Sequence, residues 1–222
     1  MELYKVASFE NTDIPLLKKV ASTGKPVIMS TGAASLAQID EAVSTLREAG
    51  CSKLVLLKCT SSYPASPETT NLRTIPHMGE IFKCPVGLSD HTMGIGAAIA
   101  SIALGAMVVE KHFTLRRADG GVDSAFSIEP HELEMLVTEA ERAYLALGEV
   151  KYGLSSEEVK TVEFKRSLYA GKDIQKGENF TSENVRVIRP GHGLAPRYYD
   201  LVMTRTARED IKAGTPLNWE LL

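Results

Sequence analysis

The sequence has 222 residues, of which 44% are hydrophobic and 24% charged, and its formal net charge is −3. This is the composition of a globular protein, and the length allows one large domain or two smaller ones. Lys and Arg are dispersed and no apolar run approaches the ~18 residues of a membrane span, so neither nucleic acid nor a membrane is an expected partner. The three cysteines, Cys51, Cys59 and Cys84, do not have zinc-site spacing and indicate reduced thiols and a cytoplasmic location.

The first part of the chain alternates short apolar runs with helix-like stretches. Short runs of this kind, separated by helical patterns, are typical of parallel strands in an α/β fold. The expected strands are Lys5–Phe9, Pro26–Ser30, Leu54–Cys59, Pro85–Ser89 and Met107–Phe113.

The sequence predicts three helices between and after these strands, and residues that typically begin or end a helix mark their bounds. Ser35-Leu-Ala-Gln38 predicts a capping box, and Gly50 is expected to close the helix that it begins. The small-residue segment 94–104 predicts a buried helix. A last helix is expected to begin near Glu129-Pro130, with Ser127 as its cap. Its apolar stripe contains Leu133, Val137, Ala140, Tyr144 and Leu147.

The pattern changes after Gly153. A charged stretch, 155–165, predicts a helical linker, and shorter, turn-rich segments follow it. Asp-Ile-x-x-Gly occurs at 173–177 and again at 210–214, which predicts two similar turns in one small domain. The predicted organisation is therefore an α/β domain over 1–150, a linker over 151–165 and a compact mixed domain over 166–222.

Polar and reactive groups follow each expected strand. In parallel βα folds, ligands bind at the carboxyl ends of the strands, so this row of groups predicts one polar pocket. The groups are Ser8 and Glu10, then 30–32, then 58–61, then 89–92, and finally 110–112.

Two histidines, His91 and His112, lie at the ends of successive strands. Adjacent strands are roughly 4.8 Å apart, so both imidazoles can meet one metal ion. Imidazole binds several divalent transition metals, and the sequence does not choose among them. The alternative is that each histidine is simply hydrogen-bonded.

The hydroxyls at the strand ends, together with Lys5, suit an anionic ligand such as a phosphate or a carboxylate. Their alternative role is to cap the helices that follow. The loop 120–127 is rich in glycine and carries Asp123 at its centre. It is either an ordinary βα loop or a flexible lid that brings Asp123 to a ligand.

Five motifs in this order resemble the sialic acid synthase family. They are Lys-Val-Ala-Ser at 5–8, Lys-Pro-Val-Ile-Met-Ser-Thr-Gly at 25–32, Leu-Lys-Cys-Thr-Ser-Ser-Tyr-Pro at 57–64, Gly-Leu-Ser-Asp-His-Thr at 87–92 and Glu-Lys-His-Phe-Thr-Leu at 110–115. Arg-Ser-Leu at 166–168, the first Asp-Ile-x-x-Gly, and Arg-Pro-Gly-x-Gly at 189–193 resemble the antifreeze-protein-like domain of that family. The resemblance covers nearly the whole chain.

The resemblance implies a (β/α)8 TIM barrel followed by a small antifreeze-like domain of the SAF type, in a domain-swapped homodimer. It also implies a transferase that condenses phosphoenolpyruvate with an acylamino sugar and releases phosphate with a divalent metal, Mn²⁺ or Mg²⁺. By motif, His91 and His112 bind the metal. The implied phosphoenolpyruvate site is Lys5, Ser8, Ser30, Ser61 and Ser89.

For the acceptor sugar, the resemblance implies contacts from Tyr63, Glu110 and Asp123, with Arg189 reaching across the dimer. The metal is expected to polarise the sugar aldehyde, which the enol carbon attacks before water adds and the C–O bond to phosphate breaks. Glu110 or Asp123 is the expected catalytic group that orients water or moves a proton.

The segments 7–10, 120–127 and 166–169 resemble the pseudaminic acid synthase branch of the family. That branch uses 2,4-diacetamido-2,4,6-trideoxy-L-altrose as acceptor. N-acetylneuraminate synthases usually have Pro-Asp-His where this chain has Gly-Val-Asp123-Ser. An N-acetylneuraminate or legionaminate synthase is the alternative within the class. The alternative from another class is a non-catalytic remnant or a carbohydrate-binding partner.

A whole (β/α)8 barrel needs about 250 residues, and this chain carries five expected strands in its first domain. They match the last five βα units of the family, since Lys5 and its strand match the fourth unit. An open barrel exposes strand edges, so the chain alone is expected to be poorly stable and catalytically weak.

Overall fold

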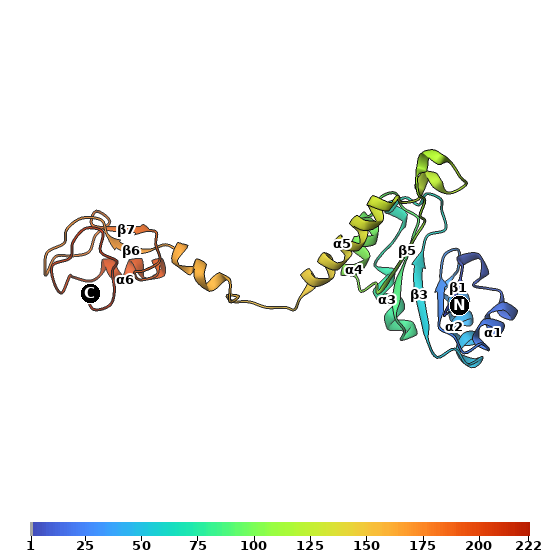
Figure 1. Cartoon of the computed structure of the whole chain (residues 1–222). Helices are drawn as coiled ribbons and strands as arrows, with labels where there is room; N and C mark the ends of the chain where they lie inside the picture. The colour runs from blue at the N-terminus through green and yellow to red at the C-terminus, as the bar shows by residue number, and fades with distance from the viewer. Residues whose placement is uncertain (1) are drawn as a thin grey trace. The chain divides into compact units, whose positions relative to one another are not determined.

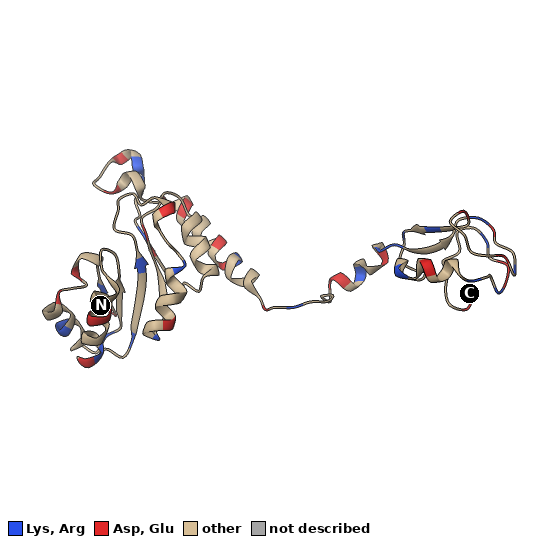
Figure 2. Cartoon of the chain, turned by 180° about the vertical axis from the view of Figure 1, so that it is seen from behind, with Lys and Arg blue, Asp and Glu red and all other residues tan. Residues whose placement is uncertain are grey.

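The computed structural model describes residues 2–222 and divides them into two compact units, the first ending at Glu149 and the second spanning Val150–Leu222. Lys and Arg are interspersed with Asp and Glu over both units (Figure 2). Among the described residues, no helix combines the length and the apolar character that crossing a membrane requires.

The first unit is built on a five-stranded parallel sheet whose strands are paired in chain order (Figure 1). Each strand pairs with the next along the chain, as in a partial TIM barrel. The register places Ser89 opposite Glu110 and Asp90 opposite Lys111. The strands are β1 (Tyr4–Val6), β2 (Val27–Ser30), β3 (Leu54–Cys59), β4 (Val86–Asp90) and β5 (Val108–Lys111).

Helices follow each strand and pack beside the sheet (Figure 1). They are α1 (Ile14–Ala21), α2 (Leu36–Glu48), α3 (Thr74–Phe82), α4 (Gly96–Ala103) and α5 (Pro130–Leu147). Short 3-10 helices occur in the loops: η1 (Ser8–Glu10), η2 (Pro67–Thr69), η3 (Arg117–Asp119) and η4 (Ser124–Phe126).

The predicted capping box at the start of α2 is present. The Ser35 hydroxyl accepts a hydrogen bond from the Gln38 backbone N–H at 3.3 Å, and the Ser35 N–H donates to the Gln38 side chain at 2.9 Å. Two orphan N–H groups of the first turn are thereby satisfied. Gly50 follows the helix with a φ of 99°, a left-handed conformation that favours glycine.

Alternate residues of the strands face α1, α2 and α3 and form the main core. On β3, Leu54 and Leu56 point into this core together with Leu46 of α2 and Met78 of α3. Leu46 and Leu56 are fully buried, and each such side chain stabilises the fold by roughly 1.5–3 kcal/mol. The opposite residues of the strands face the interior of the partial barrel.

Two helix predictions need correction. Within α4 only Ala98 and Ser101 are buried, so the segment is not the buried helix that its apolar composition suggested. Ser127 does not cap α5, because its hydroxyl donates to the Asp123 carbonyl, and Glu129 is the N-cap residue instead. The predicted stripe on α5 is largely exposed, and the buried side chain of this helix is Leu136.

The second unit combines a two-stranded antiparallel sheet with short helices. Its elements are η5 (Glu158–Phe164), β6 (Ser167–Ala170), β7 (Val185–Ile188), η6 (Pro196–Tyr198) and α6 (Tyr199–Met203). Leu168, Phe180 and Leu217 lie at the centre of its own core. The stretch expected to be a helical linker contains the 3-10 helix η5.

The two Asp-Ile-x-x-Gly segments lie against each other. Ile174 and Ile211 exchange both backbone hydrogen bonds, each at 2.8 Å. Asp173 accepts from the Ala213 N–H at 2.8 Å, and Asp210 accepts from the Lys176 N–H at 2.8 Å. Each turn therefore supplies the carboxylate that satisfies a backbone N–H of the other.

Candidate active site

The ends of β4 and β5 bring the two predicted histidines together. The ring centroids of His91 and His112 are 5.1 Å apart. His91 Nδ1 lies 2.8 Å from the Thr60 carbonyl oxygen, which can only accept, so Nδ1 carries the proton and Nε2 keeps its lone pair. His112 Nδ1 lies 3.5 Å from Asp123 Oδ2.

These contacts match what metal-binding histidines require. An imidazole that binds a metal through one nitrogen commonly donates from the other to a carbonyl or a carboxylate. The Thr60 carbonyl serves His91 in this way, and the Asp123 carboxylate lies beside Nδ1 of His112 at the distance of an ion pair. The pair therefore fits a divalent cation held by imidazole nitrogen.

Two aromatic side chains pack around the imidazoles. The Tyr63 ring lies 4.3 Å from that of His91 and 5.9 Å from that of His112, measured between centroids. Phe126, from the glycine-rich loop, lies 5.1 Å from His112 and 5.9 Å from Tyr63. The loop that carries Asp123 thus closes one side of the site, and Asp123 and Phe126 both contact His112.

A carboxylate lies beside the histidines on the same face of the sheet. Glu110 Oε1 accepts a hydrogen bond of 2.6 Å from the Ser89 hydroxyl, and Glu110 Oε2 lies 3.6 Å from Lys5 Nζ. Ser89, Glu110 and both histidines line one small cavity of about 230 Å³, together with Lys111. A substrate atom in this cavity meets a carboxylate, a hydroxyl and two imidazoles.

Gly32 lies at the centre of a second group of polar side chains. A Cβ atom at this position would lie 2.2 Å from Ser61 Oγ, 2.7 Å from Ser8 Oγ and 3.0 Å from Cys59 Sγ. The Gly32 N–H also donates to Ser8 Oγ at 3.1 Å. Two hydroxyls and a thiol, from the segment after β1 and the end of β3, therefore converge on a position where any side chain larger than that of glycine would clash.

The Ser30 hydroxyl is a buried polar group that has no hydrogen-bond partner among residues 2–222. Beside it, Asn11 donates to the carbonyls of Ser30 and Gly32 at 3.4 and 3.2 Å and so fixes the backbone after β2. Because leaving a buried hydroxyl unsatisfied costs about 1–3 kcal/mol, Ser30 has unused capacity for a ligand.

The pKa values of several groups in this site are shifted, among them Cys59, His91 and His112. Burial raises the pKa of the Cys59 thiol, but hydrogen bonds with His91, Ser8 and Ser61 outweigh it and bring that pKa to about 7. Burial acts to lower the pKa of His91, but its contacts with Cys59 and the Thr60 carbonyl leave it raised. Burial, followed by the neighbouring His91, lowers the pKa of His112, which favours the neutral imidazole.

Two further groups lie outside this arrangement. Arg189 belongs to the second unit, so its expected contact with the sugar stays a prediction. Glu129, His131 and Glu132, at the start of α5, also gather potential metal ligands. Arg117 forms ion pairs with both Glu129 and Glu132 and so offsets part of their negative charge, which gives this cluster a structural role.

Four residues gained a place in the site only from the structure: the sequence did not single out Asn11, and it counted Gly32, Cys59 and Thr60 among the groups at the strand ends without giving them a role. Three of them lie in or beside the motifs at 25–32 and 57–64, which was the available signal. Asn11 lies outside every motif, and its contact with the β2 loop spans 19 to 21 residues of sequence. That contact exists only once the strands are adjacent.

Comparison with known proteins identifies the family to which a parallel sheet with these polar groups at its strand ends belongs. The model of the NeuB family matches residues 1–152, and the SAF domain model matches residues 165–222. The chain belongs to the NeuB family and ends in a SAF domain.

Several of the similar proteins are acid synthases by name. The chain is 42% identical to the pseudaminic acid synthase of Campylobacter jejuni over 96% of its own length and 62% of that protein. It is 39% identical to the N,N'-diacetyllegionaminic acid synthase of the same species, over 96% and 64%. The chain thus spans just under two thirds of the length of these curated relatives.

The fold is also that of a solved relative. The spore coat polysaccharide biosynthesis protein of Bacillus subtilis is 33% identical, with a TM-score of 0.63, over 99% of this chain and 67% of that one. The expected partial TIM barrel with a SAF domain is confirmed.

Proposed function

We propose that this chain carries the active site of a nonulosonic acid synthase of the pseudaminic acid type. The reaction joins phosphoenolpyruvate to 2,4-diacetamido-2,4,6-trideoxy-L-altrose and releases phosphate. The observation that carries the proposal is the single cavity at the ends of β4 and β5, where Ser89, Glu110 and two imidazoles meet. The identity of 42% to a pseudaminic acid synthase supports the same assignment.

The polar groups around Gly32, with Ser30 and Lys5, suit an anionic substrate. Hydroxyl donors and one ammonium group hold a phosphate or carboxylate without covalent chemistry. Ser8, Ser30, Ser61 and Ser89 with Lys5 are accordingly proposed to hold phosphoenolpyruvate. Fixing this substrate next to the aldehyde converts an encounter of two molecules into a reaction within one complex.

His91 and His112 are proposed to hold a divalent cation, Mn²⁺ or Mg²⁺, with Thr60 and Asp123 orienting the two imidazoles. When bound, such a cation polarises the aldehyde oxygen of the sugar. The protein's part is to hold both imidazoles at the edge of the cavity, with the lowered pKa of His112 favouring its neutral form.

Glu110 is proposed to move a proton or to orient the attacking water, with Asp123 as the second candidate. Its Oε1 is held by Ser89 at 2.6 Å, which fixes the carboxylate in one orientation. Tyr63, Asp123 and Arg189 are proposed to contact the sugar. Arg189 does so from the partner in a domain-swapped homodimer.

A legionaminate synthase is the second candidate, because the identity to one such enzyme is nearly as high, at 39%. The two acceptors are both diacetamido sugars, so the residues proposed to contact the sugar could bind either of them. We favour the first assignment because the loop 120–127, which carries Asp123 and Phe126, resembles the pseudaminic acid synthase branch.

The test is phosphate release from phosphoenolpyruvate in the presence of Mn²⁺ with a panel of acceptors. The panel holds the diacetamido altrose, the legionaminate precursor and N-acetylmannosamine. Release with the altrose alone supports the proposal, and release with only another acceptor moves the assignment to that branch. If none releases phosphate although the chain binds Mn²⁺, the chain alone is inactive, as expected of a partial barrel, and binding of the same sugars then tests the non-catalytic carbohydrate-binding alternative.

A matched pair of variants identifies the catalytic carboxylate. Glu110→Gln keeps the size of the side chain and removes its charge, so we expect turnover to fall about 100-fold or more. Glu48→Gln, an exposed residue of α2, is the control and should retain full turnover. Full turnover by Glu110→Gln would remove Glu110 from the proposed role.

A further inference from the structure

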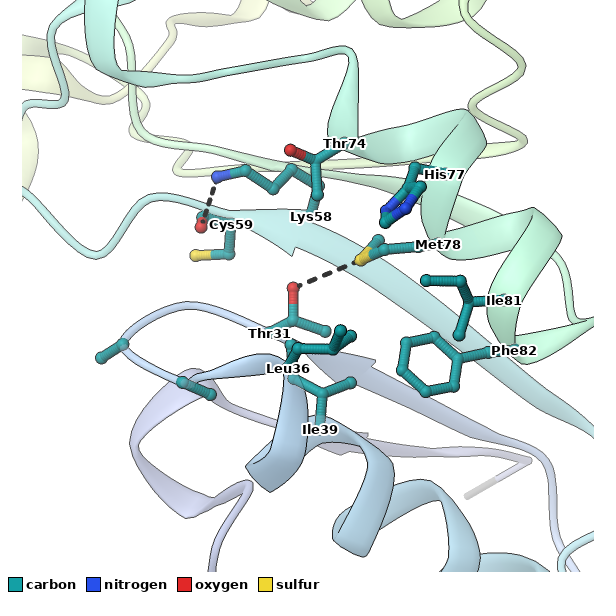
Figure 3. A pocket seen from close by; sticks show the side chains of 12 residues that line it. Thr31, Leu36, Ile39, Lys58, Cys59, Thr74, His77, Met78, Ile81 and Phe82 are labelled. Carbon is teal, nitrogen blue, oxygen red and sulfur yellow. Dashed lines mark hydrogen bonds between the residues drawn. The ribbon is translucent and has the colours of Figure 1, made fainter.

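A cavity of about 450 Å³ lies between α2 and α3, on the helix side of the sheet. Leu36 and Ile39 of α2 face Met78, Ile81 and Phe82 of α3 across it (Figure 3). This volume and this apolar lining are those of pockets that bind small organic molecules. Cys59 of the candidate active site also lines it, but the residues proposed to bind the substrates or the metal do not.

One side of this cavity is polar. Lys58, Thr74 and His77 line it and also line a neighbouring, more open cavity of about 830 Å³, which Arg73 and Glu68 border as well. An elongated ligand could therefore keep an apolar body between the helices and place a polar head at this shared edge.

Lys58 lies on the helix-facing side of β3, where Leu54 and Leu56 belong to the core. Its ammonium group donates to the Cys59 carbonyl at 2.8 Å and to the Thr60 hydroxyl at 3.0 Å. An ammonium has three N–H donors, so one is left for a ligand. Within residues 2–222, no carboxylate is in ion-pair contact with Lys58 or Arg73.

The charges near the cavity favour an anion. Lys58 and Arg73 are cationic, while the carboxylate of Glu68 accepts a hydrogen bond from Ser66 at 2.9 Å. A guanidinium offers two parallel N–H donors that match a carboxylate. We propose that the cavity between α2 and α3 is a second binding site, which takes a small carboxylate with an apolar body.

A ligand in this cavity would contact residues that are next in sequence to those of the candidate active site. Thr31, which lines the cavity, precedes Gly32, and Lys58 holds the backbone of Cys59 and the side chain of Thr60. The Thr60 carbonyl is in turn the hydrogen-bond partner of His91. The proposal of a binding site between α2 and α3 does not require that the chain have synthase activity.

The test uses the 222-residue chain and octanoate as the probe, with affinity measured by isothermal titration calorimetry. We expect octanoate to bind at one site, 1-octanol to bind at least about tenfold more weakly, and acetate to show no binding. The tenfold difference is that of one charge-assisted hydrogen bond, roughly 1.5 kcal/mol.

Two variants locate the site. Lys58→Met should weaken octanoate binding about tenfold, and Ala34→Phe should abolish it by filling the cavity, while Lys19→Met on the exposed face of α1 should bind as the unmodified chain does. Circular dichroism shows whether each variant is folded. Unchanged affinity in Lys58→Met, equal binding of octanol, or no octanoate binding overturns the proposal.

Discussion

Lys111 and Asp90 form a buried ion pair, 2.8 Å from Nζ to Oδ2, across the ends of β5 and β4. Lys111 also donates to the Thr92 carbonyl at 2.7 Å, and Asp90 accepts from the Thr92 N–H at 2.8 Å. Each partner adjoins a candidate metal ligand, since His91 follows Asp90 and His112 follows Lys111. The pair thus fixes the two strand ends that present the imidazoles.

Removing one partner of this pair should destabilise the first unit strongly. Lys111→Met leaves the Asp90 carboxylate buried without its counter-charge, so we expect the free energy of unfolding to fall by about 3–5 kcal/mol. Urea unfolding measures this change. The control is Lys53→Met, an exposed lysine before β3, which should change it by less than about 0.5 kcal/mol.

The double variant Asp90→Leu with Lys111→Met separates charge burial from lost packing. Replacing both members of a buried ion pair by apolar residues is often neutral, so it should recover most of the stability that Lys111→Met loses. A double variant as unstable as the single one would contradict this account.

Two glycines of the first unit should respond in opposite directions to the same substitution. A Cβ at Gly87 would lie 2.1 Å from the Val108 carbonyl oxygen and 2.7 Å from Leu57 Cδ2, whereas a Cβ at Gly96 meets open space. Gly87→Ala should lower the free energy of unfolding by about 1–3 kcal/mol or more. Gly96→Ala, in α4, should raise it by about 0.4–1 kcal/mol. Equal effects in urea unfolding would refute the geometry.

The two cores should unfold as separate transitions in calorimetry. Leu46→Ala removes a fully buried side chain from the first core and Leu168→Ala removes one from the second. Each should cost about 2–5 kcal/mol and lower the midpoint of its own transition only. A single transition that both variants shift would show that the units unfold together.

The second unit should lose stability in acid through Asp173. Its hydrogen bond with the Lys212 side chain, and then that with the Ala213 N–H, lower the pKa of the Asp173 carboxyl. This contribution is therefore complete above the ordinary aspartate pKa of about 3.9 and is lost as pH falls through the lowered value. Melting of Asp173→Asn should depend less on pH than melting of the unmodified chain, and Asp200→Asn serves as the control.

Strand positions were predictable because short apolar runs between helical patterns have few other structures available. Leu54–Cys59 was predicted with the bounds of β3, and the three strands that begin at Val27, Val86 and Val108 differ only at their ends. The first strand was predicted as Lys5–Phe9, but β1 ends at Val6 and Ser8–Glu10 form the 3-10 helix η1. The meeting of His91 and His112 followed from the fixed spacing of neighbouring strands. These features depend on local pattern and on sheet geometry alone.

Features that depend on tertiary contacts between distant segments could not be predicted from the local sequence pattern. The apolar stripe of α5 was visible in sequence, but the pattern cannot say what covers it, and Val137 and Tyr144 are 62% and 68% exposed. Ser127 has the composition of a cap, yet its hydroxyl binds the Asp123 carbonyl. The space beside Gly32 depends on side chains from two other segments, Ser8 after β1 and Cys59 and Ser61 at the end of β3.

The reciprocal turns at Asp173 and Asp210 bear on how fast the second unit can form. The hydrogen bond from Ala213 to Asp173 joins residues 40 positions apart, and that from Lys176 to Asp210 joins residues 34 apart. Neither turn gains its partner until the chain between them has closed into a loop. Closing such a loop lowers the conformational entropy of the chain before the stabilising contacts form. Folding is therefore slower when the contacting residues are farther apart in the sequence. We expect the step in which the two turns come into contact, rather than formation of the short helix α6, to limit the folding rate of the second unit.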